Sequence, residues 1–238
     1  MKPNNHVSYF RLLALIQMII QRGHIMYQTI LFDLDGTLTD SGKGITNAVS
    51  YALAKAGIQV EDKSTLFPFI GPPLKDSFKE FYHFTEEQAS QRVRDYREYY
   101  NVKGLFENEV YPGIEKLLSD IKKSGRRIGL ATSKPDKLSI QILDHFHLLP
   151  YFDIISAPTM DEKRNTKIEV IEYALEQFGI TDVSDVVMVG DRKFDILGAK
   201  HFGMDSIGVL YGYGSREELT KAGATYLVEN TEGIWSVL

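Results

Sequence analysis

The stretch LFDLDGTLTD, residues 31–40, decides the fold of this chain because it ends an apolar run with two closely spaced carboxylates. The overlapping run TILFDL is apolar nearly throughout, as in a strand that is buried on both faces of a parallel sheet. Residues two positions apart in a strand point to the same side, so Asp33 and Asp35 are expected to face one crevice. Two carboxylates that close need a shared proton or a neighbouring cation. The stretch therefore predicts a central strand with a candidate site at its end.

After residue 110, short β-rich runs alternate with longer helical patterns. The strand candidates are RIGLAT, FDIIS, DVVMVG, SIGVL and TYLV. The helix candidates are residues 114–121, 136–147, 167–178 and 195–202, and a capped short helix that opens at Ser215 with Glu218. Such alternation predicts an α/β fold with a Rossmann-like parallel sheet core, helices on both faces and right-handed crossovers.

Residues 41–110 carry helical signals and no convincing strand. Thr85 and Gln88 fit a capping box, and apolar residues recur at helical spacing after it. The sequence GPP at 71–73 interrupts the helices and indicates a fixed turn. This segment is predicted to be an all-helical cap inserted into the core. The predicted core then comprises residues 26–40 and 111–238.

The first 25 residues differ from the rest of the chain. The run FRLLALIQMIIQRGH is too short for the ~20 apolar residues that a membrane-spanning helix needs. No small-x-small cleavage site follows the run, which disfavours a secretory signal peptide. We interpret residues 1–25 as an N-terminal extension outside the fold, which starts near Met26.

The composition of the 238 residues is that of an ordinary globular protein, with 43% hydrophobic and 25% charged residues. The net charge is −5, and the basic residues are scattered apart from a short patch at residues 122–127, so no nucleic-acid partner is expected. We expect a cytoplasmic protein without a membrane partner, and a monomer, since no heptad or exposed apolar stripe is visible. Cysteine is absent, so oxygen or histidine must hold any metal.

Polar side chains cluster where the predicted strands end, which is where ligands bind to an open α/β sheet. They are Asp33, Asp35 and Thr37 after the first strand, Thr132, Ser133 and Lys134 after RIGLA, Asp191 and Asp195 after VVMVG, and Lys167 at the start of an intervening helix. Four aspartates without a histidine or cysteine motif nearby suit Mg²⁺. Simpler interpretations are a turn at Asp35, a helix N-cap at Thr132, Ser133 or Asp191, and a solvated Lys167.

The segments DLDGTLTD, ATSKP and GDRKFDILGAK, together with Lys167, resemble motifs I to IV of the haloacid dehalogenase superfamily. The resemblance runs from about Met26 to the end of the chain. It points to the phosphoglycolate phosphatase-like branch, which has a helical C1-type cap inserted after motif I. The segment GVLYGYGS after motif IV also looks typical of that branch. The resemblance implies a Mg²⁺-dependent phosphomonoesterase whose partner is a small phosphorylated metabolite: phosphoglycolate, a nucleoside monophosphate or a sugar phosphate.

The resemblance also implies roles for individual residues. Asp33 would be the nucleophile that forms an aspartyl-phosphate, and Asp35 would be the general acid and then the base. Dehalogenases lack this second aspartate, so Asp35 favours phosphoryl transfer. The phosphoryl oxygens would be held by Thr132, the backbone at Ser133 and Lys167. The Mg²⁺ ligands would be the Asp33 carboxylate, the Asp35 backbone carbonyl and Asp191, with Asp195 in support.

Several assignments stay open. The segment TMDEKRNTKIEV offers Lys163, Arg164 and Lys167 for motif III; Lys167 is preferred for its place at a helix start, and Arg164 is a candidate second phosphate or substrate contact. Further candidate substrate contacts are Ser41, Lys43 and Lys75. A phosphomutase of the same family would pass its phosphoryl group to a sugar hydroxyl. A non-catalytic phospho-acceptor or phosphate-sensing module is disfavoured by the cap-sized insertion.

Overall fold

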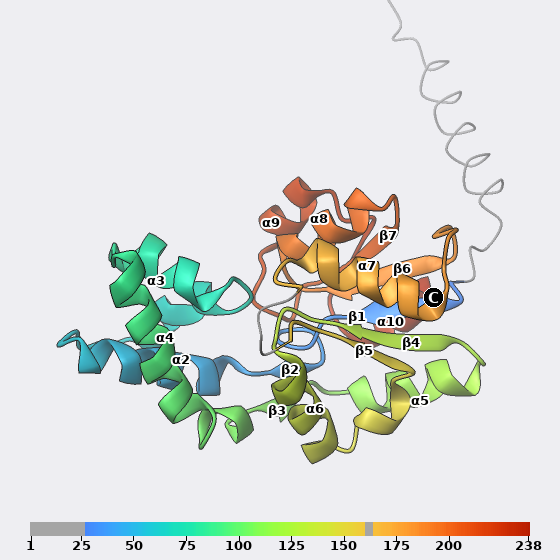
Figure 1. Ribbon diagram of the computed structural model, residues 1–238. Coiled ribbons are helices and arrows are strands. Elements are labelled where there is room, and N and C mark those ends of the chain that lie inside the picture. Colours follow the sequence, from blue (N-terminus) through green and yellow to red (C-terminus); the bar gives the residue numbers. More distant parts are fainter. Residues whose placement is uncertain (1–26, 160–163) are drawn as a thin grey trace, which may run out of the picture.

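The computed structural model of the protein describes residues 27–159 and 164–238, so the predicted extension at residues 1–25 lies outside the described residues. A six-stranded parallel sheet forms the centre of the fold (Figure 1). Its strand order is β5-β4-β1-β6-β7-β8. The strands are β1 (Thr29–Phe32), β4 (Arg127–Ala131), β5 (Ile154–Ser156), β6 (Val186–Gly190), β7 (Asp205–Val209) and β8 (Tyr226–Val228). The predicted α/β fold with a Rossmann-like parallel sheet is confirmed.

The side chains of the sheet alternate between two apolar layers. In β1, Ile30 and Phe32 belong to one buried cluster and Leu31 to another, as the period of two dictates. Burial on both sides explains why the first strand is apolar throughout. One face is covered by α5 (Ile114–Lys123), α6 (Asp136–His145) and α10 (Thr231–Val237), and the other by α7 (Lys167–Phe178), α8 (Lys193–His201) and α9 (Arg216–Ala222) (Figure 1). The sequence analysis missed α10, which has seven residues and shows too little of the helical period.

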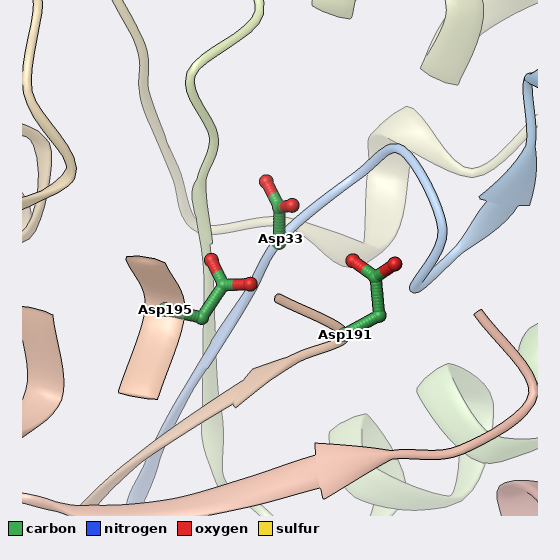
Figure 2. Close-up of side chains that lie close together, drawn as sticks. All are labelled: Asp33, Asp191 and Asp195. Carbon is green, nitrogen blue, oxygen red and sulfur yellow. The ribbon is translucent and has the colours of Figure 1, made fainter. Parts of the chain in front are cut away.

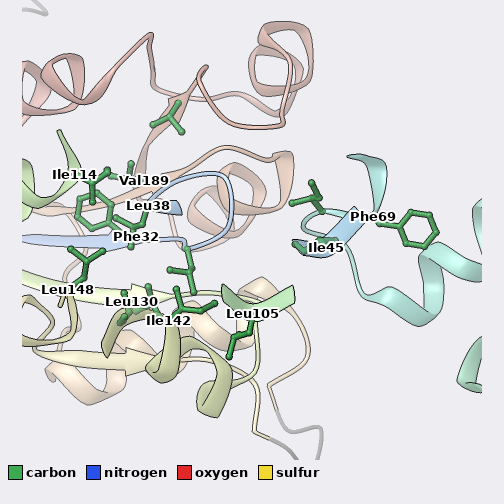
Figure 3. Close-up of a cluster of buried hydrophobic side chains, with 14 of the residues drawn as sticks. Phe32, Leu38, Ile45, Phe69, Leu105, Ile114, Leu130, Ile142, Leu148 and Val189 are labelled. Atoms are coloured by element: carbon green, nitrogen blue, oxygen red, sulfur yellow. The ribbon is translucent and has the colours of Figure 1, made fainter. Parts of the chain in front are cut away.

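Between β1 and β4 in the sequence, helical elements form a separate lobe beside the sheet (Figure 1). This helical lobe consists of α2 (Gly42–Lys55), the 3₁₀-helix η1 (Lys63–Phe69), α3 (Leu74–Tyr82), α4 (Glu86–Tyr100) and the 3₁₀-helix η2 (Gly104–Phe106). The predicted capping box starts α4, because Thr85 and Gln88 each accept a hydrogen bond from the other's backbone amide. Figure 3 shows that Ile45 and Phe69 of the lobe belong to the same hydrophobic cluster as Phe32. No helix among residues 27–159 and 164–238 is long and apolar enough to cross a membrane.

A short antiparallel ribbon joins the lobe to the sheet. Strand β2 (Thr39–Asp40) pairs with β3 (Glu109–Val110). The expectation that residues 41–110 hold no strand is therefore wrong at the last two residues. Strands of two residues cannot show the period-two alternation by which a strand is identified. Because both chain crossings between sheet and lobe pass through this ribbon, the ribbon holds the two crossings side by side.

Candidate active site

A cavity lies beside the carboxyl end of β1, where the strand order of the sheet reverses. Strands β4 and β5 lie on one side of β1, and β6, β7 and β8 lie on the other. This switch point is where open α/β sheets bind their ligands. The cavity measures about 740 Å³, is open on one side, and is lined by loops of the sheet and by the helical lobe. Its sheet side includes Asp33, Asp35, Thr132, Ser133 and Lys167.

Three carboxylates meet at this end of the sheet. Figure 2 shows the carboxylates of Asp33, Asp191 and Asp195 side by side, and one oxygen from each lies within 4.8 Å of the others. Asp33 follows β1, where its amide donates to the Val189 carbonyl over 2.9 Å. Asp191 follows β6, and Asp195 lies in the first turn of α8, where its carboxylate accepts from the Arg192 amide over 3.0 Å. Parallel pairing of β1 with β6 thus brings distant residues into one buried cluster.

Lys167 neutralises part of this cluster. It is the first residue of α7, whose N-cap is Thr166. The Lys167 Nζ lies 2.9 Å from Asp33 Oδ1 and 2.7 Å from Asp195 Oδ1, and it donates to the Ala131 carbonyl over 2.9 Å. Burial disfavours the charged ammonium, but the Asp195 and Asp33 carboxylates outweigh burial and raise the pKa of Lys167. The ammonium is therefore buried and charged, which excludes the interpretation of Lys167 as a solvated side chain.

Asp35 also lines the cavity but pairs with a different lysine. Its Oδ2 accepts from Lys134 Nζ over 2.6 Å, and the two side chains are 13% and 6% exposed. Strand β1 ends at Phe32 and Gly36 has a φ of 83°, so the chain turns out of the strand between them. The two-residue strand spacing from which a common crevice was predicted therefore does not hold, although both carboxylates line the cavity. Sequence reasoning assigned no role to Lys134.

The remaining negative charge suits a divalent cation. Burial, with Asp195 and Asp33 nearby, raises the pKa of Asp191 well above its ordinary value. Burial also raises the pKa of Asp195 to about 6, against the opposing charge of Lys167. The buried Asp191 Oδ1 has no hydrogen-bond partner within the described part of the chain, whereas Oδ2 accepts from the Tyr213 amide over 2.7 Å. When all four aspartates are ionised, the two lysines leave two negative charges, and the donor set fits a cation that prefers oxygen.

The raised pKa of Asp195 gives the metal-free protein a defined pH dependence. A carboxyl that binds its proton more tightly when folded stabilises the fold at low pH, and this stabilisation is lost as the pH rises. We expect the contribution of Asp195 to the free energy of unfolding to fall between pH 3.8 and about 6, the ordinary and the raised value for Asp195. In denaturant titrations of the metal-free protein, the unaltered chain should therefore lose stability relative to Asp195→Asn as the pH rises through this range. Equal pH slopes for the two proteins would contradict this prediction.

The simpler interpretations of the other motif residues do not hold. Helix α6 has Pro135 as its N-cap, so neither Thr132 nor Ser133 caps it. Thr132 is buried, and its Oγ1 accepts from the Lys134 amide over 3.2 Å. The N-cap of α8 is Arg192 and not Asp191. Thr132, Ser133 and Asp191 therefore do not cap these helices, which excludes the simpler interpretation of each as a helix N-cap.

The three candidate substrate contacts within the insertion, Ser41, Lys43 and Lys75, lie in different places. Lys75 lines the cavity, and its ammonium forms an ion pair with Glu86. Ser41 is buried and Lys43 is exposed, and neither is among the described residues that line the cavity. Only Lys75 of the three is thus placed where a ligand in the cavity would meet it.

Arg164 is not among the residues that line the cavity in the described part of the chain. Its guanidinium lies over the Tyr173 ring at 4.1 Å from the ring centroid, and its Nε donates to the Ala157 carbonyl over 3.1 Å. The structure therefore does not bring Arg164 to the site, in contrast to Lys167. Lys163, the third candidate for motif III, lies outside the described residues.

Helix α4 supplies the opposite wall of the cavity, which the sequence analysis missed. The cavity-lining residues recur at helical spacing and are Ser90, Val93, Arg94, Arg97 and Asn101. The stacked rings of Tyr96 and Tyr100, with centroids 5.0 Å apart, also line the cavity, and Lys134 Nζ lies 5.0 Å from the Tyr100 centroid. The sequence analysis recognised the helical period of the apolar residues in α4. The polar residues that recur at the same spacing beside them were the signal from which this wall could have been predicted.

Arg192 links the sheet to the lobe and was also missed. Its guanidinium donates to the Ile70 carbonyl at the end of η1, and its Nε lies 3.0 Å from the Glu218 carboxylate of α9. Arg192 also lines the cavity. Its neighbour Asp191 was recognised as part of a motif, but no local pattern marks an arginine whose partners are 122 and 26 residues away.

The fold and the site together define an α/β protein with a buried carboxylate centre and an inserted lobe that covers it. The family profile described as haloacid dehalogenase-like hydrolase matches residues 30–209. The chain therefore belongs to the haloacid dehalogenase-like hydrolases, and the resemblance drawn from its motifs is confirmed.

The chain is also similar to individual proteins of known sequence or structure. The chain is 41% identical over 214 residues to a 5′-nucleotidase of Pseudomonas aeruginosa, covering 90% of this chain and 96% of that protein. It is 34% identical over 198 residues to the tyrosine-protein kinase PtkA of Mycobacterium tuberculosis, covering 83% of this chain and 67% of that protein. A crystal structure of a predicted phosphatase from Clostridium acetobutylicum is similar with a TM-score of 0.85 at 51% identity, covering 89% of this chain and 97% of that one.

Proposed function

We propose that this chain is a phosphomonoesterase that hydrolyses a small phosphorylated metabolite through an aspartyl-phosphate on Asp33. The observation that carries the proposal is that two carboxylates line one cavity in different surroundings. Asp33 lies in the carboxylate cluster beside Lys167, whereas Asp35 lies outside the cluster and pairs with Lys134. Two carboxylates in different surroundings suit two different roles, a nucleophile and a proton donor. Membership of a hydrolase family and the similarity to a 5′-nucleotidase support the same conclusion.

The carboxylate cluster would hold Mg²⁺. The ligands would be Asp33, Asp191, Asp195 and the Asp35 backbone carbonyl, an all-oxygen set of the kind that this ion prefers. The cation, when bound, would offset the negative charge of the phosphoryl oxygens. The unpartnered Asp191 Oδ1 supports this assignment, because a buried carboxylate oxygen without a donor is costly to leave unpaired.

The residues of the chain would divide the reaction into two steps. In the first, an Asp33 oxygen forms a bond to phosphorus, the bond to the leaving oxygen breaks, and Asp35 gives that oxygen a proton. In the second, water forms a bond to phosphorus, Asp35 takes the proton from the water, and the bond to Asp33 breaks. Lys134 donates to Asp35 Oδ2, so Asp35 Oδ1 would be the oxygen that exchanges the proton with the leaving group and with water. Lys167, Thr132 and the backbone at Ser133 would hold the other phosphoryl oxygens.

The cavity favours a nucleoside monophosphate over the smaller candidates. A volume of about 740 Å³ is in the range of sites for drug-sized ligands and is far larger than glycolate requires. Phe69, Tyr96, Tyr100 and Phe194 line its walls; the first three are buried, and the partly exposed Phe194 offers a surface on which a base can pack. We propose that the helical lobe is the cap, within residues 41–110, that covers this leaving group and excludes water from the site.

Phosphate release from a panel of monoesters, with and without Mg²⁺, tests the function. We expect nucleoside 5′-monophosphates to be hydrolysed faster than phosphoglycolate or glucose 6-phosphate. Removing divalent cations with a chelator should lower the rate at least ~100-fold, because the carboxylate cluster would then repel the phosphate, and adding Mg²⁺ in excess should restore it. Hydrolysis that survives chelation would contradict the metal site. Isomerisation of β-glucose 1-phosphate without phosphate release would identify a phosphomutase instead.

A further inference from the structure

The loop between β7 and α9, residues 210–215, packs on both chain crossings between the sheet and the helical lobe. On the first crossing, the Tyr211 hydroxyl donates to the Thr37 carbonyl over 2.9 Å. On the second, the Tyr111 ring, which follows β3, lies against the Tyr211 ring with centroids 4.8 Å apart. This loop belongs to the segment GVLYGYGS, to which the proposed reaction assigns no role.

Tyr213 joins this loop to the carboxylate cluster and to the lobe. Its amide donates to Asp191 Oδ2 over 2.7 Å. Its hydroxyl accepts from the Gly42 amide over 2.6 Å and donates to the Asp40 carboxylate. Its ring lies 5.7 Å, centroid to centroid, from the ring of Phe67 in η1. One residue therefore contacts the carboxylate cluster, the ribbon strand β2, the first turn of α2 and a second element of the lobe.

Tyr213 supplies a hydrogen-bond partner to the first turn of α2, where the Gly44 amide is already paired by the Glu107 carbonyl. The N-cap residue Ser41 makes no side-chain hydrogen bond to the helix. An uncapped helix leaves amide groups unpaired, and here the Gly42 amide is paired by Tyr213 from the sheet, with a longer contact of 3.2 Å to Asp40. Burial, with Asp40 nearby, raises the pKa of Tyr213, so its hydroxyl keeps the proton that it donates.

The packing around Tyr213 leaves no room for a side chain at three neighbouring glycines. A Cβ atom added at Gly36 would lie 2.8 Å from the ring, and one added at Gly42 would lie 2.7 Å from the hydroxyl. A Cβ at Gly212 would lie 2.4 Å from the Asp191 Cβ. Glycines thus allow the close approach on which these contacts depend.

We infer that Tyr213 is a positioning residue, which fixes the start of the lobe relative to Asp191 and so holds the lobe over the cavity. The part of this inference that concerns substrate rests on the proposed function. Losing the hydroxyl removes the contacts to Gly42 and Asp40 but keeps the backbone contact to Asp191. The start of the lobe should therefore become more mobile, while the contact of the Tyr213 amide with the carboxylate cluster is kept.

Amide hydrogen exchange in the whole protein tests the inference without any assay of activity. In Tyr213→Phe, the peptide that covers residues 39–46 should exchange at least ~10-fold faster, as expected for the loss of hydrogen bonds that include a charged partner. The matched control is Tyr27→Phe. Tyr27 is buried, and its hydroxyl donates to Asp205 over 2.8 Å. This contact lies at the amino-terminal ends of β1 and β7, on the side of the sheet opposite the cavity. Equal exchange of residues 39–46 in the two variants would overturn the inference.

Steady-state kinetics give a second readout. For a nucleoside 5′-monophosphate, Tyr213→Phe should raise KM at least ~5-fold, while the concentration of Mg²⁺ that gives half-maximal activity changes less than ~2-fold. An increase in the Mg²⁺ requirement that matches the increase in KM would overturn the inference, because the hydroxyl would then act on the carboxylate cluster. If the unaltered protein hydrolyses no phosphomonoester, the proposed function fails, and the exchange experiment alone decides the role of Tyr213.

Discussion

Replacing Asp33 with asparagine is expected to lower the rate of phosphate release at least ~10⁴-fold, because a neutral amide cannot act as the nucleophile toward phosphorus. The amide oxygen can still accept the hydrogen bond that Lys167 donates to Asp33 Oδ1. The replacement also relieves the repulsion among Asp33, Asp191 and Asp195. Asp33→Asn should therefore fold, and its thermal unfolding temperature should not fall. Single-turnover measurements with excess enzyme separate loss of chemistry from weakened binding.

The control for this variant is Asp205→Asn. Asp205 is also an aspartate with hydrogen-bond partners, since it accepts from Tyr27 and Thr225, but it lies at the amino end of β7, away from the cavity. Its replacement should cost stability and leave the rate of the folded enzyme within ~3-fold. Activity of Asp33→Asn within ~10-fold of the unaltered chain would remove Asp33 from the role of nucleophile.

Replacing Asp35 with asparagine is expected to have an effect that depends on the leaving group. A nucleoside needs a proton on departure, so its release should slow ~10² to 10⁴-fold when the proton donor is lost. para-Nitrophenolate leaves without a proton, so its first step should slow much less. Because Asp35 also serves the second step as the base, the phosphoenzyme should accumulate. Stopped-flow records with para-nitrophenyl phosphate should then show a burst close to one equivalent of product, followed by slow turnover.

Lys134→Gln gives the comparison for Asp35→Asn. Glutamine can still donate a hydrogen bond to Asp35 but lacks the charge of Lys134, which lies 2.6 Å from Asp35 Oδ2. This variant keeps the proton donor and should show no burst. Equal rate losses for the nucleotide and the para-nitrophenyl ester in Asp35→Asn would contradict the assignment of Asp35 as acid and base.

Local patterns were sufficient to predict the sheet and the sheet side of the site. The strands are buried on both faces and read as apolar runs, and each helix between them has a clear period, as at residues 167–178, where α7 has the predicted bounds. A parallel sheet places all carboxyl ends on one side, so Asp33, Thr132 and Asp191 could be placed together because each follows a predicted strand. The motif resemblance then gave each of them an expected role.

The remaining features depend on contacts between distant segments, which leave no local pattern. Lys134 follows a strand end, as predicted, but its pairing with Asp35 depends on how the chain turns at Gly36. The ribbon of β2 and β3 is too short to show a period. The wall formed by α4 depends on how the lobe sits against the sheet, so Arg94 and Arg97 could be recognised as helical but not as cavity-lining.

The central claim is that the phosphoryl group passes through Asp33. Acid quenching during turnover of a nucleoside 5′-monophosphate, followed by borohydride reduction and peptide mass spectrometry, tests it most directly, because reduction converts an aspartyl-phosphate to homoserine. We expect homoserine at position 33, more of it in Asp35→Asn and none in Asp33→Asn. Homoserine at Asp35, Asp191 or Asp195, or rapid turnover with no modified aspartate at any quench time, would contradict the account.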